Sequence, residues 1–383
     1  MGQRLSILSA LVLLVGSCTP LKIRDLIPDK NHDWAMYGGN IERANAAQSI
    51  VTPPLSVAWE YDAAAGFSPY STAAVGNYLF VGNLQGEVHS IDIVTGKGKG
   101  VHDFGSAVVG TPIIDTDILY VALAHDDQSL IAYDLGQGLI LWTAKLGDIE
   151  TSPLLIGQQL FVTTMKGRMV CIDKIKGDIL WSYEVTAGGK MNVVRSSPAS
   201  DGTLLFFGCD NSHLYAVDIR NGKLKWSAKT GASIVASPSV SNGKVFVGSH
   251  DNFFYAFDAG TGKELWKQSL GSKIYAPQAV DEQNIYVGTS GRTVYCLKKE
   301  NGHIVWTFTA GSIINSSPLV SGNVVYVGCA DKNLYALDCT TGKPLWQFIA
   351  PGRIKTMPVI WKQYLFVLSE DRSVIALKST STQ

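Results

Sequence analysis

The chain has 383 residues, of which 46% are apolar and 17% charged, and its 32 basic residues balance its 32 acidic ones. This composition describes a folded chain with a large core, and closed all-β architectures often use such a length in one domain. Nucleic-acid binders usually carry a basic excess or a basic stripe, so we expect no nucleic-acid partner.

The first residues of the chain read as an export signal. Residues 1–17 contain basic Arg4, an apolar run over residues 5–15 and two small residues. This run is too short to span a bilayer as a helix, so we interpret 1–17 as a signal peptide. The ending VGSC resembles the lipobox of bacterial lipoproteins, which implies that Cys18 is acylated. In a cell with two membranes, Thr19 after the cysteine implies sorting to the outer membrane. The alternative is a chance cysteine behind an ordinary signal.

A repeat begins after a tether and lead-in segment that we place at residues 18–53. A tryptophan recurs at steps of about forty residues, with one double gap in which Gly100 stands at the tryptophan position. Aromatic, small-residue and glycine columns keep the same phase. The repeat therefore has eight units. Its tryptophans are Trp59, Trp142, Trp181, Trp226, Trp266, Trp306 and Trp346.

Each unit predicts four short strands separated by Gly, Asn and Asp turns. In the turn DCTTGK (338–343), Asp338 can accept backbone N–H bonds and Gly342 can take a positive φ, which favours a tight hairpin. Lys298 and Lys378 break the Asp column. The small-residue column leaves room for a neighbouring sheet. Filling that gap with a buried tryptophan is worth roughly 1.5–3 kcal/mol per repeat.

Four strands per unit and eight units predict an all-β fold: an eight-bladed β-propeller of four-stranded antiparallel blades over residues 54–383. Residues 356–378 supply three strands without a tryptophan strand, and residues 56–62 form a tryptophan strand with nothing before it. We expect this N-terminal strand to complete the last blade and remove the open sheet edges. An open solenoid is the competing architecture.

The cysteines that follow Cys18 occupy core positions of the repeat. Two stand in the small-residue column and two follow the glycine that ends a strand. Although export would permit disulfides, five cysteines spread over separate units offer no natural pairing. We expect small buried core residues.

The pattern Ala-x-Asp-x-x-Thr-Gly-x-x-x-Trp, kept at 256–266 and 336–346, resembles the tryptophan-docking repeat of quinoprotein-type propellers, and DWAMYGGN (33–40) resembles their lead-in. Two branches carry this repeat: dehydrogenases that use pyrroloquinoline quinone with calcium, and lipoproteins similar to BamB, which act as scaffolds in outer-membrane β-barrel assembly. The long insertions, calcium-ligating acids and adjacent cysteines of the dehydrogenases cannot be matched here.

The resemblance therefore implies a non-catalytic scaffold without a cofactor, anchored to the outer membrane by lipid and facing the periplasm. Its expected partner is a protein, with the barrel-assembly subunit as the candidate. Two alternatives stay open: a quinone-binding redox protein, and a propeller that binds a glycan or another small ligand.

One unit is longer than the others, since Trp181 and Trp226 are forty-five residues apart. The excess falls in residues 186–198, where apolar residues lie between basic ones, and a lengthened loop on a regular disc suits a partner contact. A drifted turn is the alternative. The candidate partner-binding residues are Lys190, Met191, Asn192, Val193, Val194 and Arg195.

A second candidate site is the mouth of the central channel, which we assign to the position three residues before the proline that precedes each first strand. Four of its members are apolar and four polar, so we expect no metal cage and no catalytic group. The second-to-third strand hairpins, such as HDDQ (125–128), are expected to be solvated turns. The polar channel-mouth candidates are Glu150, Arg195, Asn315 and Lys355.

Overall fold

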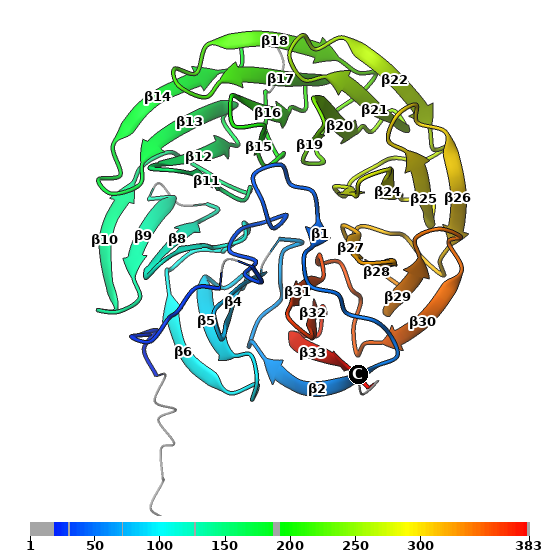
Figure 1. The fold of residues 1–383 in the computed structure, drawn as a ribbon. Helices are drawn as coiled ribbons and strands as arrows, with labels where there is room; N and C mark the ends of the chain where they lie inside the picture. The colour runs from blue at the N-terminus through cyan, green and yellow to red at the C-terminus, as the bar shows by residue number, and fades with distance from the viewer. Residues whose placement is uncertain (1–18, 30, 71, 126–127, 187–191, 381–383) are drawn as a thin grey trace, which may run out of the picture.

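The computed structural model describes residues 19–29, 31–70, 72–125, 128–186 and 192–380, and in them eight β-sheets stand in a ring around a central axis (Figure 1). Each sheet contains a blade of four antiparallel strands, numbered from the axis outward, which confirms the predicted propeller; the seventh sheet has β1 as a fifth strand, parallel to its innermost strand. Blade 1 consists of β3 (Thr72–Val75), β4 (Tyr78–Gly82), β5 (Glu87–Asp92) and β6 (Gly98–Asp103), and blade 2 of β7 (Ile113–Asp115), β8 (Ile118–Ala122), β9 (Leu130–Asp134) and β10 (Leu139–Ala144). Blade 3 consists of β11 (Leu154–Ile156), β12 (Gln159–Thr164), β13 (Arg168–Asp173) and β14 (Ile179–Glu184), and blade 4 of β15 (Ala199–Ser200), β16 (Leu204–Gly208), β17 (His213–Asp218) and β18 (Leu224–Lys229).

The second half of the ring repeats this order. Blade 5 consists of β19 (Ser239–Ser241), β20 (Lys244–Gly248), β21 (Phe253–Asp258) and β22 (Glu264–Ser269), and blade 6 of β23 (Ala279–Val280), β24 (Asn284–Gly288), β25 (Thr293–Lys298) and β26 (Ile304–Thr309). Blade 7 consists of β27 (Leu319–Ser321), β28 (Val324–Gly328), β29 (Asn333–Asp338) and β30 (Pro344–Ile349), and blade 8 of β31 (Val359–Trp361), β32 (Tyr364–Leu368), β33 (Ser373–Ser379) and β2 (Leu55–Asp62).

The ring closes where the two ends of the repeat meet. Strand β2 pairs antiparallel with β33, so that Leu55 lies opposite Ser379 and Asp62 opposite Ser373. The prediction that an N-terminal strand completes the last blade is confirmed. Closure gives the last blade its fourth strand, so β33 is paired on both sides and does not form an exposed edge.

A tryptophan joins most blades to the next one. In blade 4, Trp226 lies opposite Ala216 in the strand register, and its indole N–H donates to the Ala259 carbonyl of blade 5 at 2.9 Å. A Cβ on Gly262 of blade 5 would stand 2.5 Å from the indole ring, so this turn needs glycine. The small residue is therefore the tryptophan's partner within one blade, and the indole fills the gap to the following turn.

The turn chemistry predicted for the repeat is present. The Asp338 carboxylate accepts N–H bonds from Thr340 at 3.0 Å and from Thr341 at 2.8 Å, and Gly342 adopts φ 68°. The Thr341 hydroxyl also donates to this carboxylate at 2.9 Å, and this bond, followed by the N–H bonds, lowers the pKa of Asp338.

In blades 3 to 5 a serine stands two residues before the first strand and joins neighbouring blades near the axis. The N–H of Ser152 donates to Ser197 Oγ, and the N–H of Ser197 donates to Ser237 Oγ, both at 2.9 Å. Blade 6 departs from this pattern. Its register places Ala279 opposite Tyr286, as Ser239 lies opposite Phe246 in blade 5.

This register corrects one step of the sequence alignment. Pro277 stands at the serine position, and Gln278 stands where the proline column was expected. The channel-mouth position of blade 6 is consequently Tyr275, whereas Ile274, which the alignment placed there, is fully buried.

The lead-in segment, residues 31–53, runs across one face of the disc, where Figure 1 shows it in dark blue over the axis. Its short strand β1 (Ala46–Ala47) pairs in parallel with β27. Carbonyls along the segment accept N–H bonds from the first strands of successive blades. The donors are Ala74, Ile114, Ser200, Val240, Val280 and Val320.

The first described residues fill the one blade junction that lacks a tryptophan. Pro20 forms a parallel bridge with Val101 on β6, and Leu21 is fully buried between blades 1 and 2. The Ile23 N–H donates to the Leu135 carbonyl at 2.7 Å, the position that an indole N–H serves elsewhere. A Cβ on Gly100 would stand 2.6 Å from the Pro20 carbonyl oxygen. Glycine is therefore required at this tryptophan position, because the N-terminal segment at Pro20 and Leu21 passes over it.

The core lies between adjacent blades. The thiols of Cys171, Cys209, Cys296, Cys329 and Cys339 are free and buried, as expected for small core residues. Among the described residues no helix has the length and apolar character needed to cross a membrane.

Candidate functional site

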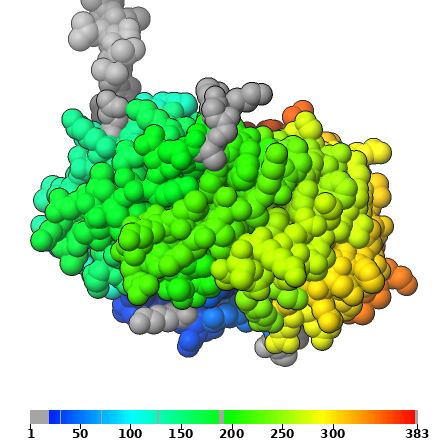
Figure 2. Space-filling view, turned by 90° about the horizontal axis from the view of Figure 1, so that it is seen from above, coloured from blue at the N-terminus to red at the C-terminus, as the bar shows by residue number. Residues whose placement is uncertain are grey.

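The disc has two unlike faces. On one, which we call the hairpin face, each hairpin between second and third strands bonds the loop that leads into its blade, as when the His250 N–H donates to the Ser233 carbonyl. The opposite face, which we call the lead-in face, carries the third-to-fourth strand turns and residues 31–53. Figure 2 views the disc from its rim, with the blue lead-in residues below.

The predicted channel-mouth residues lie on the hairpin face, in the loops that enter four different blades. Arg195 forms an ion pair with Asp210, and Lys355 forms one with Glu370. In both pairs the carboxylate belongs to the hairpin of the same blade. Glu370 also lies 3.7 Å from Arg353 Nε, so two cations share this carboxylate. Asn315 enters blade 7 without joining either pair. The four residues do not converge on one ligand position.

Tyr275 is a mouth residue that the sequence reasoning missed because of the shift at Pro277. Its side chain is 39% exposed, and its ring centroid lies 4.4 Å from that of His250 on blade 5. Burial lowers the pKa of His250, and nearby Lys273 lowers it further. The imidazole is therefore neutral at pH 7, and this corner offers an aromatic surface.

The long loop before blade 4 carries the partner-binding candidates. Lys190 and Met191 lie outside the described residues. Val193 is 8% exposed and Val194 is fully buried in the core between blades 3 and 4. Asn192 donates to the Val185 carbonyl at 2.6 Å, and Arg195 reaches solvent. Of the described candidates, Asn192 and Arg195 are accessible to a partner, and partner binding itself stays a prediction.

The hairpin of blade 2 approaches the loop that enters blade 3. Ligand atoms of His125, Asp148 and Glu150 lie within 4.8 Å of one another. Sequence reasoning considered the HDDQ hairpin by itself and could not see that Asp148 and Glu150 of the next blade come beside it. His125 is largely exposed, and its Nδ1 lies 3.3 Å from Asp148. The three side chains form a polar cluster that is open to solvent.

The lead-in segment closes the other mouth of the channel with two fully buried side chains. Arg43 donates to the carbonyls of Pro198 at 3.0 Å, Pro153 at 2.8 Å and Tyr37. Its guanidinium also lies 5.1 Å from the Tyr37 ring centroid, a cation–π contact. Burial lowers the pKa of Arg43 and raises that of Tyr37 to about 12.

A buried cation is costly unless its donors are satisfied. The carbonyls of Pro153 and Pro198, just before β11 and β15, and the Tyr37 carbonyl accept the hydrogen bonds of Arg43. Because Arg43 contacts blades 3 and 4 while the same segment bonds blades 5, 6 and 7, the lead-in ties the inner strands together. A channel ligand would have to enter from the hairpin face.

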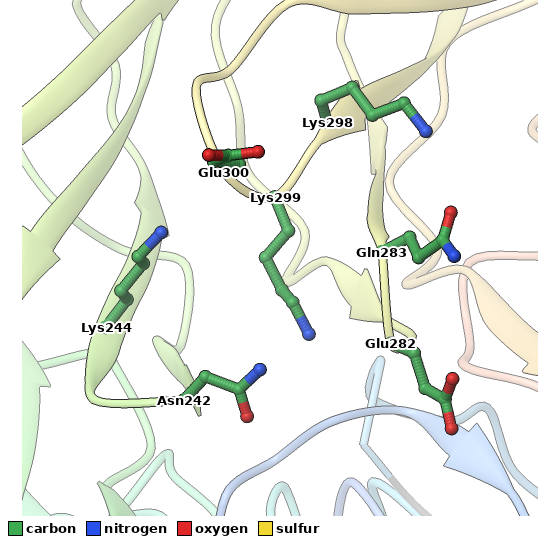
Figure 3. Close-up of a pocket in the computed structure, with 7 residues that line it drawn as sticks. All are labelled: Asn242, Lys244, Glu282, Gln283, Lys298, Lys299 and Glu300. Carbon is green, nitrogen blue, oxygen red and sulfur yellow. The ribbon is translucent and has the colours of Figure 1, made fainter.

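The lead-in face also carries a cavity of about 400 Å³ over blades 5 and 6 (Figure 3). Lys298, which breaks the Asp column, lies beside Lys299 on its wall. The Lys299 amine donates to the Asp281 carbonyl at 2.8 Å and to Ser241 Oγ at 3.2 Å. Figure 3 shows the amines of Lys298 and Lys299 pointing in different directions. The remaining lining residues are Asn242, Lys244, Glu282, Gln283 and Glu300.

Segments of the chain are similar in sequence both to BamB proteins and to quinone-dependent dehydrogenases. A segment of the chain is 28% identical over 83 residues to outer membrane protein assembly factor BamB of Shewanella oneidensis, covering 22% of this chain and 19% of that protein. Another is 31% identical over 87 residues to the dehydrogenase subunit of the quinone alcohol dehydrogenase of Gluconacetobacter polyoxogenes, covering 21% and 12%. The matched segments thus span a fifth or less of these relatives.

The structural comparison extends over most of the chain. The crystal structure of BamB from Moraxella catarrhalis superposes with a TM-score of 0.73, covering 85% of this chain and 99% of that one at 17% identity. At this identity the likeness concerns the fold. The family profile described as outer membrane protein assembly factor BamB matches residues 56–193, 185–273 and 253–381, which together take in all eight blades. The chain belongs to this family of repeat propellers.

Proposed function

We propose that this chain is a non-catalytic, lipid-anchored scaffold of the cell envelope that takes part in outer-membrane β-barrel protein assembly. The family match over the whole propeller carries the proposal. In this role residues 1–17 are removed, Cys18 bears the acyl chains, and the disc faces the periplasm and binds a protein partner, with the barrel-assembly subunit as the candidate.

The closed channel supports a scaffold over an enzyme. Arg43 and Tyr37 are fully buried beneath the lead-in segment, and the Arg43 guanidinium donates to the carbonyls of Pro153 and Pro198. At the hairpin face, Arg195 and Lys355 are paired with carboxylates of their own blades. The groups around the axis hold the ring together, so the binding surfaces of a scaffold would be the loops.

The redox alternative is favoured by the matches to quinone-dependent alcohol dehydrogenases. Calcium takes about six to eight oxygen ligands. Among the described residues, the group with three ligating side chains is His125, Asp148 and Glu150, which contributes one imidazole and lies between blades 2 and 3. These donors do not fit a calcium–quinone pair, and we derive no redox step through them.

Cross-linking in native membranes tests the scaffold. A photo-activatable phenylalanine analogue at Arg195 places the probe on the hairpin face of blade 4. The same analogue at Glu300, an exposed turn residue on the lead-in face of blade 6, is the matched control. We expect a barrel-assembly subunit to be captured at 195 and not at 300. Capture of no such subunit from either position would contradict the proposal.

A melting curve with and without pyrroloquinoline quinone and calcium tests the redox alternative. A ligand that binds only the folded state raises Tm by mass action, so we expect an unchanged Tm. A rise of several degrees would favour the quinone protein. The same measurement with cell-wall glycan fragments tests the small-ligand alternative.

A further inference from the structure

We propose that the rim of blades 1 to 3 rests against the lipid headgroups of the membrane that holds the acyl chains of Cys18, so that the disc stands edge-on. This orientation rests on the lipid anchor of the proposed function. It deepens that function by assigning the surface that meets the membrane.

The tether between Cys18 and the disc is short. The Val101 N–H donates to the Thr19 carbonyl at 2.9 Å, and the Leu21 N–H donates to the Val101 carbonyl at 3.1 Å. The chain is thus bound to β6 from the first residue after Cys18. A residue spans at most about 3.6 Å, so an acylated Cys18 has its backbone within roughly one residue of this rim. The membrane surface must lie equally close.

The rim next to this point carries three consecutive exposed apolar residues, one more than the pair Ile304 and Val305 at the corresponding place on blade 6. Strand β10 begins with Leu139, Ile140 and Leu141, which are 57%, 48% and 50% exposed. Blade 3 continues the surface with Ile179 and Leu180. Successive side chains of a strand point to opposite faces, so the run covers both sides of this edge. Exposed apolar groups that gather in this way mark interaction surfaces.

Two contacts join these residues to the anchor point and to each other. A Cβ on Gly138, just before β10, would lie 3.7 Å from the Leu21 carbonyl oxygen and 3.8 Å from Lys22. Further along β10, the indole N–H of Trp142 donates to the Lys174 carbonyl in the turn before β14, at 3.1 Å. We call the continuous surface from Lys22 through β10 to Leu180 the anchor rim.

Charge on the anchor rim suits a lipid surface. Leu21 and Ile23 are buried, so the alternating Lys22 and Arg24 project outward, and both are exposed. Basic residues beside a membrane are attracted to anionic headgroups. Apolar side chains flanked by basic ones form the usual composition of surfaces that lie in the membrane interface.

The depth of contact follows from the backbone. Strand β10 is the outermost strand of blade 2, so its outer N–H and C=O groups have no strand partner. Such groups cannot enter the hydrocarbon core unsatisfied. The anchor rim therefore lies at headgroup level, where water still reaches the strand edge. Blade 6, four blades further around the ring, points away from the membrane.

Site-directed spin labelling tests this orientation, because the five native cysteines after Cys18 are buried and leave an introduced cysteine selectively reactive. Ile140→Cys places the label on the anchor rim. Ile304→Cys is the matched control on blade 6: each residue stands two before its tryptophan, and they are 48% and 44% exposed. The full-length acylated proteins are reconstituted in phosphatidylethanolamine–phosphatidylglycerol vesicles, and label collisions with oxygen and with a water-soluble nickel chelate are measured.

We expect the oxygen-to-nickel collision ratio to be several-fold higher at 140 than at 304. Equal, water-like ratios on protein whose Cys18 carries acyl chains by intact mass would overturn the edge-on orientation and leave the scaffold function standing. A Cys18 without acyl chains would overturn the anchor and the orientation together. Melting curves of both variants confirm that each label sits on a folded disc.

Discussion

Two junctions of the ring solve the same problem with different parts of the chain. Between blades 4 and 5, the indole of Trp226 lies on the Gly262 turn and donates to the Ala259 carbonyl. Between blades 1 and 2, where Gly100 replaces the tryptophan, Leu21 fills the gap and the Ile23 N–H serves the Leu135 carbonyl. The gap demands one apolar volume and one donor, and a peptide from outside the repeat supplies both.

The two junctions differ in how the N-terminal segment, residues 19–23, contributes to stability. At the other junctions a blade brings its own indole, so the contact forms within the repeat. At the exception the ring is completed only when residues 19–23 dock. The junction between blades 1 and 2 is therefore stable only while residues 19–23 are docked, and a change that weakens one should weaken the other.

The largest effect is expected at a tryptophan junction. Trp226→Ala leaves a cavity between blades 4 and 5, and loss of a buried aromatic costs about 3–5 kcal/mol. Trp266→Ala is the matched control, because its indole nitrogen has no hydrogen-bond partner in the described residues. We expect Trp226→Ala to cost about 1 kcal/mol more. Chemical denaturation of both variants measures the free energies of unfolding. Equal losses would show that the Trp226 indole N–H bond does not contribute to stability.

Leu21→Ala tests whether the peptide replaces the indole. Leu21 is fully buried between blades 1 and 2, so we expect a loss of about 2–5 kcal/mol. Its neighbour Lys22 is exposed, and Lys22→Ala should change the free energy of unfolding by no more than about 0.5 kcal/mol. A similar small value for Leu21→Ala would show that the N-terminal segment is not part of the junction.

Gly100→Trp restores the repeat, so the new indole competes with the N-terminal segment for the gap between blades 1 and 2. The new side chain meets the Pro20 carbonyl and Leu21, so it should cost about 1–3 kcal/mol and displace the segment. Trypsin should then cleave faster after Lys22 and Arg24. Combined with Leu21→Ala, the cost should fall below the sum of the single changes, because both act on one gap. Strict additivity would contradict the shared site.

The smallest effect concerns a turn common to most blades. The pKa of Asp338 is lowered by bonds from Thr341 and Thr340, so its stabilising contribution is complete above the ordinary aspartate pKa. It is lost as pH falls through the lower, folded-state pKa. Asp338→Asn should therefore lessen the acid-induced fall of Tm. Glu300→Gln, in the corresponding turn of blade 6, is the control and should leave the acid profile unchanged.

Much of the fold could be predicted because the repeat writes the same local chemistry into each blade. The Asp338 turn and closure by residues 56–62 follow from alternation, turn residues and spacing. The small-residue column was expected to make room for a neighbouring sheet, whereas the register shows that Ala216 lies opposite Trp226 within one blade. The shift at Pro277 was missed because proline marks the column, and only the strand register shows that Gln278 occupies it.

The candidate site was less predictable. Val193 and Val194 read as exposed loop residues, yet the return of this loop onto blade 4 buries them. The meeting of His125 with Asp148 joins loops of two blades, and no local pattern encodes their distance. Arg43 reads as an ordinary charged residue until the lead-in is seen to cross the axis.

The number of blades, their strand order and the strand that closes the ring could be predicted from residue patterns, because these depend on local periodicity repeated in phase. The folded structure was needed to show that the lead-in covers one channel mouth, that Leu21 and Ile23 replace an indole, and that the anchor rim adjoins the first residue after Cys18. Each of these joins residues far apart in the chain, and only the closed ring brings them within contact distance.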